Sequence, residues 1–335
     1  MLVHDDPRIL NIETLRLVAV FSLVAYHTIG ATSESGLELA YPHPLRFAAD
    51  ALVDLRMPLF AFISGWIYAQ RPVAPHSFGR FFSSKLRRLY IPGVVAALSF
   101  WIISTFIVPD SAGQNAPIAN IFTLTYVHYW FLHAILFTLL GIALVESLLR
   151  APLGPVALGI AALTFFLLPG IYVPHLHLNG VLYLAPFFFL GVLLARQEDF
   201  IHQNRTAIII ISITAAACGL ALNMESLLAT GEMSLDRRDV QSALLSIGLI
   251  ILLLLFLPRI RALSGFGSVA FTIYLYHVFG TSGMRRAADA VGIEATPVVF
   301  ILCVAAGFGV PILIHVFFLQ TVATRTFFLG IRQGR

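Results

Sequence analysis

An arginine and a histidine stand eleven residues apart in the apolar segment ETLRLVAVFSLVAYHTIG, which covers residues 13–30. At about 100° per residue, this spacing places Arg16 and His27 within about 20° of one helical face and about 16 Å apart along the axis. Ionisable groups are costly inside a membrane helix and usually face a polar cavity. Histidine titrates near pH ~6.5, so His27 could take a proton or carry an acyl group.

Each of these two residues also has a structural interpretation. Arg16 could extend its side chain to the membrane interface as an anchor, and His27 could be a hydrogen-bonded packing residue. Glu13 precedes Arg16 by three residues and could pair with it. The shared face favours a functional pair, because two ionisable groups then mark two depths of one path through the membrane.

The composition places these residues in a lipid bilayer. Of 335 residues, 59% are hydrophobic and only 11% are charged, a balance far more apolar than that of a soluble domain. We therefore predict an all-α integral membrane protein with one membrane domain over residues 1–335 and no separate soluble domain. Windows long enough to cross about 30 Å of hydrocarbon predict ten helices near residues 12–30, 47–69, 90–108, 127–149, 153–169, 180–195, 206–223, 240–257, 268–283 and 297–320.

The basic residues predict the orientation of this domain. With a cytoplasmic N-terminus, fourteen basic residues fall in cytoplasmic segments and five in the opposite loops, and an excess of Lys and Arg marks the cytoplasmic side. Both termini should therefore be cytoplasmic. The net charge of +4 needs no nucleic-acid partner, because basic patches flanked by aromatic residues are absent. Both cysteines lie in apolar runs, and we expect neither a disulfide framework nor a metal site.

Several short motifs follow the first helix in order: LFAFISG with Ser64, a basic pair ahead of a proline, a WFL segment at Trp130, GVLL from Gly191, and IYLYH ending at His277. The basic pair is Lys85 and Arg88. Together with the spacing of the first helix, these motifs resemble acyltransferase family 3, a family of integral membrane O-acyltransferases. The wording RMPLFAFISGW is similar to the branch that contains the fucose O-acetylases. The resemblance covers nearly the whole chain.

The resemblance implies an acyltransferase of the bacterial cytoplasmic membrane. Its donor would be an acyl-CoA, most often acetyl-CoA, and its acceptor a hydroxyl of a cell-surface or exported saccharide or glycolipid. His27 and Arg16 would be catalytic, and Lys85, Arg88 and Ser64 would bind the donor. An arginine guanidinium can bind a phosphate through two hydrogen bonds, and a lysine ammonium adds a positive charge. The alternative for the basic loop is membrane topology alone.

One departure from the family pattern concerns the acid that would support His27. Many members carry an acidic residue six positions before the serine of the second helix, where this chain has Pro58. Asp54 is the first replacement that we expect, and Asp50 lies one helical turn away on the same face. The alternative is that both acids only pair with neighbouring arginines near the outer interface.

Candidates for an acceptor site are weaker. His128 and Trp130 begin a predicted helix on the outer side, where an aromatic belt is the default interpretation, and His277 could be a packing residue. The rival functions are a multi-span secondary transporter or a lipid-linked sugar flippase. The chain shows no paired halves and no short Gly/Pro-broken spans in corresponding positions, which favours the enzyme.

Overall fold

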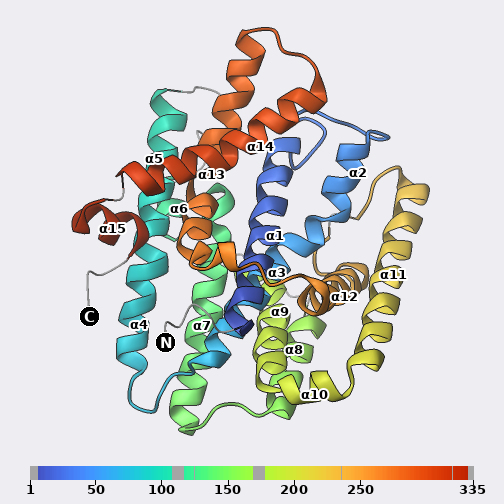
Figure 1. The fold of residues 1–335 in the computed structure, drawn as a ribbon, viewed down its shortest axis with the longest axis vertical. Coiled ribbons are helices and arrows are strands. Elements are labelled where there is room, and N and C mark those ends of the chain that lie inside the picture. The colour runs from blue at the N-terminus through green and yellow to red at the C-terminus, as the bar shows by residue number, and fades with distance from the viewer. Residues whose placement is uncertain are drawn as a thin grey trace. The chain divides into compact units, whose positions relative to one another are not determined.

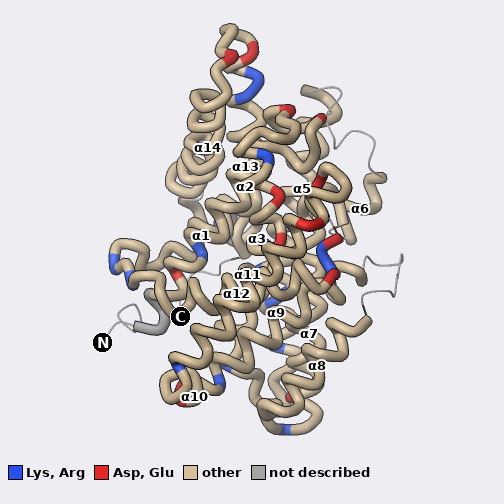
Figure 2. Tube along the Cα trace, turned by 90° about the vertical axis from the view of Figure 1, so that its right-hand side faces the viewer, with Lys and Arg blue, Asp and Glu red and all other residues tan. Residues whose placement is uncertain are grey.

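The computed structural model describes residues 7–107, 117–123, 125–168, 178–234, 236–318 and 320–330, and these residues form helices and their connections without a strand (Figure 1). Most of the Cα trace consists of uncharged residues, and Lys, Arg, Asp and Glu occupy short, scattered stretches of it (Figure 2). The α-helices are α1 (Pro7–Ile29), α2 (Pro44–Ala51), α3 (Val53–Gln70), α4 (Phe78–Lys85), α5 (Ile91–Phe106), α6 (Ala119–Phe122), α7 (Trp130–Leu149), α8 (Pro155–Leu167), α9 (Leu178–Arg196), α10 (Glu198–Gln203), α11 (Arg205–Thr230), α12 (Val240–Phe256), α13 (Phe266–Ala290), α14 (Thr296–Leu313) and α15 (Val322–Leu329), with short turns η2 (Leu86–Tyr90), η3 (Val127–Tyr129), η5 (Arg261–Leu263) and η6 (Ile314–Phe318).

Six helical stretches in the described part are long and apolar enough to cross a membrane, and α8 and α12 are shorter apolar helices. The total of ten spans and the cytoplasmic termini stay predictions. The window at 47–69 is not one helix but two, since α2 ends at Ala51 and α3 begins at Val53. A break of one residue leaves no mark in composition, because Leu52 between the helices is as apolar as its neighbours. The window at 90–108 is the second half of a longer stretch, Phe78–Phe106.

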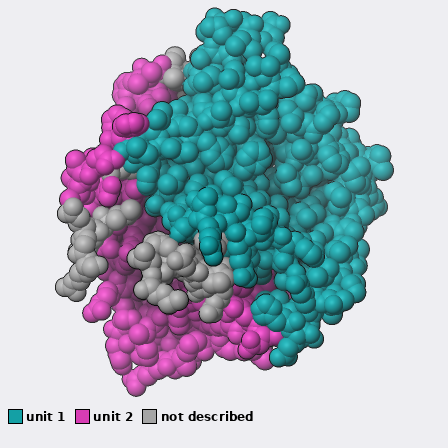
Figure 3. All heavy atoms as spheres, viewed as in Figure 1, with its two compact units in different colours: residues 1–60, 200–316 teal, residues 61–199, 317–335 magenta. Residues whose placement is uncertain are grey.

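The chain divides into two compact units (Figure 3). Unit 1 comprises residues 1–60 and 200–316, and unit 2 comprises residues 61–199 and 317–335. Helix α3 starts in unit 1 and ends in unit 2. The single membrane domain over residues 1–335 stays a prediction.

In unit 1, α1 packs against α13 and α14, and α11 packs against α12. The contact between α1 and α13 is apolar, with Val20 and Val24 of α1 against Ala270 and Ile273 of α13. Gly307 of α14 lets this layer close tightly, since a Cβ there would press on the Val24 side chain. Small residues are the usual means by which membrane helices approach one another.

In unit 2, two of the sequence motifs meet. A Cβ at Gly65, in the FISG motif of α3, would overlap the backbone carbonyl of Phe188 in α9. Reciprocally, a Cβ at Gly191, the first residue of the GVLL motif, would overlap the carbonyl of Phe62. The two glycines therefore make the closest part of one helix crossing, which explains why both motifs contain a glycine at these places.

A buried carboxylate joins three helices of unit 2. Glu146 of α7 accepts hydrogen bonds from the Tyr68 hydroxyl of α3 at 2.7 Å and from Nη1 of Arg196 of α9 at 2.7 Å. The backbone N–H of Leu153 donates to the same carboxylate at 2.8 Å, and Arg196 also donates to the Leu153 carbonyl. All four contacts satisfy polar groups that would otherwise be costly to bury.

Candidate active site

Two histidines of unit 1 face each other across the contact between α1 and α13. The ring centroids of His27 and His277 lie 5.0 Å apart, with the ring planes inclined by 52°. His277 is completely buried and His27 is partly buried. Nδ1 of His277 lies 3.0 Å from each of the backbone carbonyl oxygens of Ile273 and Tyr274. Because carbonyl oxygens only accept, Nδ1 of His277 is the donor in both contacts and carries a proton.

The local sequence explains why these rings meet. On α1, His27 follows Val20 and Val24 at spacings of seven and three residues, and on α13, His277 follows Ala270 and Ile273 at seven and four. Residues at such spacings share one helical face. Each histidine therefore continues the apolar stripe through which its helix packs on the other.

Arg16 lies on the same stripe, toward the start of α1. Its Nη1 forms an ion pair of 2.5 Å with Oε1 of Glu13, and its guanidinium fills the space that a side chain at Gly267 of α13 would need. Because Arg16 meets Gly267 and His27 meets His277, α1 and α13 run side by side in the same direction. The face predicted for Arg16 and His27 is thus the face that packs on α13.

A buried arginine that the sequence interpretation considered only as a partner for an acid lies beside the histidine pair. The guanidinium carbon of Arg56, in α3, is 3.4 Å from the centroid of the Tyr26 ring, a cation–π contact. Arg56 also lies within electrostatic range of Tyr274 and His277. The signal was present in the sequence, because Arg56 is one of only two basic residues inside the predicted helices.

The carboxylate of Asp54 lies beside side chains of α11 and α12. Its side chain is 1% exposed, and the polar side chains beside its carboxylate are Ser242 of α12 and Asn223 of α11. Neither carboxylate oxygen has a hydrogen bond of normal geometry, so Asp54 and His27 are not hydrogen-bonded in this structure. The Ser246 hydroxyl donates to the Asp54 backbone carbonyl at 2.6 Å, which fixes the start of α3 on α12.

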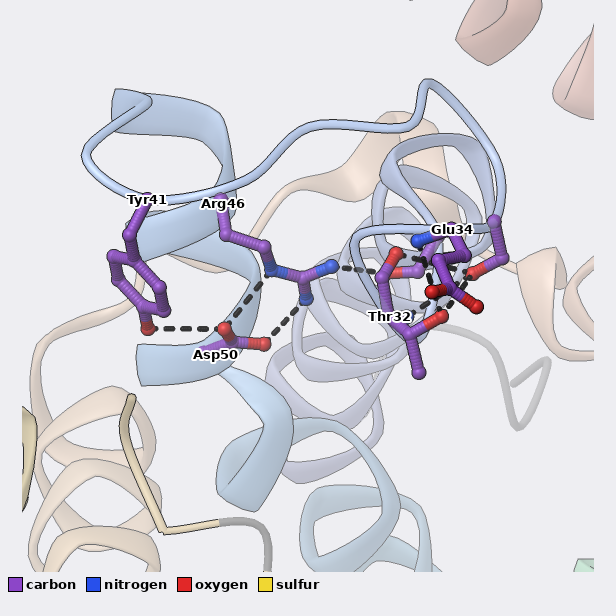
Figure 4. Close-up of polar contacts among 7 residues, drawn as sticks. Thr32, Glu34, Tyr41, Arg46 and Asp50 are labelled. Carbon is purple, nitrogen blue, oxygen red and sulfur yellow. Dashed lines mark hydrogen bonds and ion pairs between the residues drawn. The ribbon is translucent and has the colours of Figure 1, made fainter. Parts of the chain in front are cut away.

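Asp50 is held by an arginine, as the structural alternative expected. Nε of Arg46 donates to Oδ2 of Asp50 at 2.9 Å and Nη2 pairs with Oδ1, so that one face of α2 carries a two-point ion pair (Figure 4). Nη1 of Arg46 donates to the Gly30 carbonyl at 2.8 Å, just beyond the end of α1. The Arg46–Asp50 pair therefore ties α2 to the turn that follows His27.

Tyr41 completes this network from the connection between α1 and α2. Its hydroxyl donates to Oδ2 of Asp50 at 2.9 Å (Figure 4). Burial, together with this hydrogen bond and the negative charge of Asp50, raises the pKa of Tyr41 to about 12. The phenol therefore stays protonated over the whole physiological range.

The predicted donor-binding residues lie in unit 2. Lys85 is the last residue of α4, partly buried, with its Nζ 5.1 Å from the Phe81 ring centroid. The π-helical turn η2 follows it and carries the exposed Arg88, within electrostatic range of Lys85. By contrast, Nε of Arg87 donates to the Gly330 carbonyl at 3.1 Å. Ser64 is partly buried in α3. Single π-turns of this kind are frequent at functional sites.

The predicted acceptor-site residues of unit 2 are packed among aromatic rings. His128 is buried, with its ring centroid 4.1 Å from that of Tyr129 and 5.6 Å from that of Phe100. Trp130 lies beside Tyr183, with 6.3 Å between ring centroids. Within the described ranges, three or more His, Cys, Asp or Glu side chains do not gather as metal ligands at any point.

Apolar helices long enough to cross a membrane, with ionisable side chains buried between them, define a multi-pass integral membrane protein. A family model described as an acyltransferase domain matches residues 9–316. The chain therefore belongs to acyltransferase family 3, and the protein is a membrane acyltransferase. Comparison with curated proteins and with solved structures gives no match.

Proposed function

We propose that this protein is an O-acyltransferase of the bacterial cytoplasmic membrane that moves an acetyl group from acetyl-CoA to a hydroxyl of a cell-surface or exported saccharide or glycolipid. Membership of the acyltransferase family supports the reaction class. The observation that best supports a catalytic role for His27 is its partly buried ring, whose centroid lies 5.0 Å from that of the His277 ring. The fucose O-acetylase-like wording around Pro58 favours a sugar hydroxyl as acceptor.

The chemistry needs one proton acceptor. As the acceptor oxygen attacks the thioester carbon, its O–H bond breaks and a C–O bond forms, and His27 takes the proton. The C–S bond then breaks, and the thiolate of coenzyme A leaves and takes up the proton from His27. Arg16, held by Glu13 on the same stripe, contributes a positive charge toward the entrance of this path.

The donor and the acceptor would use different parts of the chain. Lys85 and Arg88, with Ser64, would hold the donor phosphates and acyl end, because Arg87 is already engaged with the Gly330 carbonyl. His128 and Trp130 are the aromatic candidates for the acceptor, and Asp50, although paired with Arg46, is the acidic one. From the sequence Asp54 is the acid expected to support His27, and His277 is a second candidate from the geometry.

Purified protein in lipid nanodiscs provides the test. We expect acetyl-CoA consumption, followed as free thiol release, to depend on added cell-surface saccharide, with the acetyl group recovered on the saccharide by mass spectrometry. His27→Ala should lower the rate by about 10²-fold to 10⁴-fold. His202→Ala is the matched control, since His202 is an exposed histidine of α10. Wild-type turnover in His27→Ala would contradict the assignment, and movement of labelled sugar without acetyl consumption would indicate a carrier instead.

A further inference from the structure

Lys85 and Arg88 are two like charges that the fold keeps close together. Arg88 lies within electrostatic range of Lys85, and among the residues that the structure describes, no acidic side chain pairs with either of them. Two cations at short range repel each other, and an anion bound by both would relieve that repulsion. Until such an anion binds, other contacts must hold the backbone that carries them.

The sequence explains the shape of this backbone. Pro92 lies inside the continuous helical stretch Phe78–Phe106. In a regular α-helix the proline ring would clash with the carbonyl of Arg88, four residues earlier, and Pro92 has no N–H to donate. The π-turn η2 stands directly before it, with the backbone N–H of Ile91 donating to the Leu86 carbonyl, five residues earlier. Such wide turns are rare, so this one needs support from its neighbours.

The end of α15 supplies that support. This helix packs against α5 and η2 (Figure 1). Nε of Arg87 donates to the Gly330 carbonyl at 3.1 Å. A Cβ at Gly330 would overlap the carbonyl oxygen of Arg87 and press on Cα of Arg88. The end of α15 therefore lies directly on the backbone of the two arginines, at a place where a side chain has no room.

Two further properties of this contact follow from helix chemistry. Gly330 ends α15 with φ +63, a left-handed conformation in which a residue with a Cβ is strained. The carbonyls at the C-terminus of a helix carry partial negative charge, which stabilises a nearby cation such as the Arg87 guanidinium. Arg87 is thereby directed to the end of α15, which leaves Lys85 and Arg88 as the cations of this turn that can meet an anion.

We propose that Arg87 and Gly330 are positioning residues for donor binding: through their contact, α15 holds η2 in the conformation that presents Lys85 and Arg88 together to the phosphates of the acyl donor. This inference rests on the proposed function, which supplies the phosphate-bearing ligand. Arg87 and Gly330 contact each other and not the donor. They strengthen binding because the two cations are held together before the donor arrives, so that less conformational freedom is lost on binding.

The Gly330→Ala substitution tests this role without changing a charge. The added methyl group has to displace α15 from η2, so the dissociation constant of coenzyme A, measured by calorimetry on protein in nanodiscs, should rise about 10-fold. The donor KM should rise in parallel, with a smaller change in kcat. Gly231→Ala is the matched control: Gly231 ends α11 with φ +82 and has open space around it, so alanine there adds backbone strain without the contact.

A second background separates positioning from general damage to the fold. In Arg88→Gln one of the two cations is gone, so adding Gly330→Ala should weaken coenzyme A binding further by no more than about threefold. A contact that only stabilises the fold would weaken binding equally in both backgrounds. Arg87→Leu should resemble Gly330→Ala. Arg87→Lys, whose ammonium can still donate to the Gly330 carbonyl, should stay within about threefold of the wild-type affinity.

Two results would overturn the inference: wild-type affinity for coenzyme A in a folded Gly330→Ala protein, or an equal loss of affinity in the wild-type and Arg88→Gln backgrounds. If Gly330→Ala does not fold, Arg87→Leu and Arg87→Lys decide, and equal affinities in these two variants would contradict the inference. A wild-type protein that does not bind coenzyme A would instead contradict the proposed function. Binding that depends on Lys85 and Arg88 but not on Arg87 or Gly330 would contradict this inference only.

Discussion

The guanidinium group of Arg16 occupies the place where a side chain at Gly267 would stand. Ten residues further along α13, His277 meets His27, eleven residues further along α1. The arginine and the histidine of α1 are therefore positioned by one neighbouring helix, and their relative position depends on how closely α13 approaches. Gly267 leaves room for the guanidinium at this end, because a Cβ there would overlap Nη1 of Arg16.

The Gly267→Ala substitution tests the role of Arg16 without changing Arg16. The added methyl group should displace the flexible guanidinium rather than the helix backbone, so stability should fall by no more than about 1 kcal/mol while kcat falls by about 10-fold. Gly283→Ala is the control, since Gly283 lies on the same helix with open space around it. Steady-state kinetics and thermal unfolding in detergent measure both effects. Equal kinetics in the two variants would remove Arg16 from the reaction.

The Asp54→Asn substitution decides between the two candidate partners of His27. If His277 supports His27, kcat should stay within about threefold of the wild type. The protein should be as stable or more stable, because a buried carboxyl group beside Ser242 and Asn223 is replaced by a neutral amide of the same shape. A fall of about 10²-fold or more in kcat would return the supporting role to Asp54. Asp50→Asn is the contrast: it leaves Arg46 buried without its carboxylate and should cost about 3–5 kcal/mol of stability.

Donor binding should depend on Lys85 and Arg88 and not on the whole basic segment. Replacing both with Gln should raise the KM for acetyl-CoA about 10-fold or more with a smaller change in kcat, because phosphate contacts mostly contribute uniform binding. Added salt should weaken donor binding in the wild type more than in the double variant. Arg80→Gln, at an exposed position of the same segment, is the control. An unchanged KM in the double variant would assign these basic residues to membrane topology alone.

Alkaline pH should weaken the connection between α1 and α2 through Tyr41. The pKa of this phenol is about 12 in the folded protein and about 10 in an unfolded chain. The folded state therefore holds a proton that the unfolded state releases, so the contribution of Tyr41 to stability is complete below pH ~10 and is lost as the pH rises toward ~12. Thermal unfolding of the wild type and of Tyr41→Phe from about pH 9 to about pH 12, a range that covers both pKa values of the phenol, measures this loss of stability. Identical slopes in the two proteins would show that the phenol does not titrate in this way.

The sequence predicts the helices well and their partners poorly. Apolar windows identify the helices because burial in lipid needs about twenty apolar residues whatever the fold. The break at Leu52 and the crossing of Gly65 with Gly191 have no such local signal, since both depend on contacts between distant segments. The sequence shows FISG and GVLL as two separate motifs, and only the structure shows that they meet where α3 crosses α9.

In the candidate site, too, the sequence predicts what depends on a single helix and does not predict what depends on contacts between helices. The shared face of Arg16 and His27 depends on the period of a single helix, so counting residues was sufficient. The approach of His277 to His27 depends on the packing of α1 on α13, and from the sequence alone His277 looked like a packing residue. The orientation of Asp54 toward Ser242 and Asn223 is likewise a tertiary property. Spacing cannot reveal which of several neighbours a buried side chain faces.

The carboxylate of Glu146 joins three helices, and this arrangement has an evolutionary consequence. Loss of the Tyr68 hydroxyl or of Arg196 alone would leave the buried acid with too few donors, and loss of Glu146 would leave the partly buried Arg196 without its counter-charge. A lineage cannot easily pass through any of these single states. Among homologous proteins, we therefore expect positions 68, 146 and 196 to vary together, and the residues found at any one of them to predict those found at the other two.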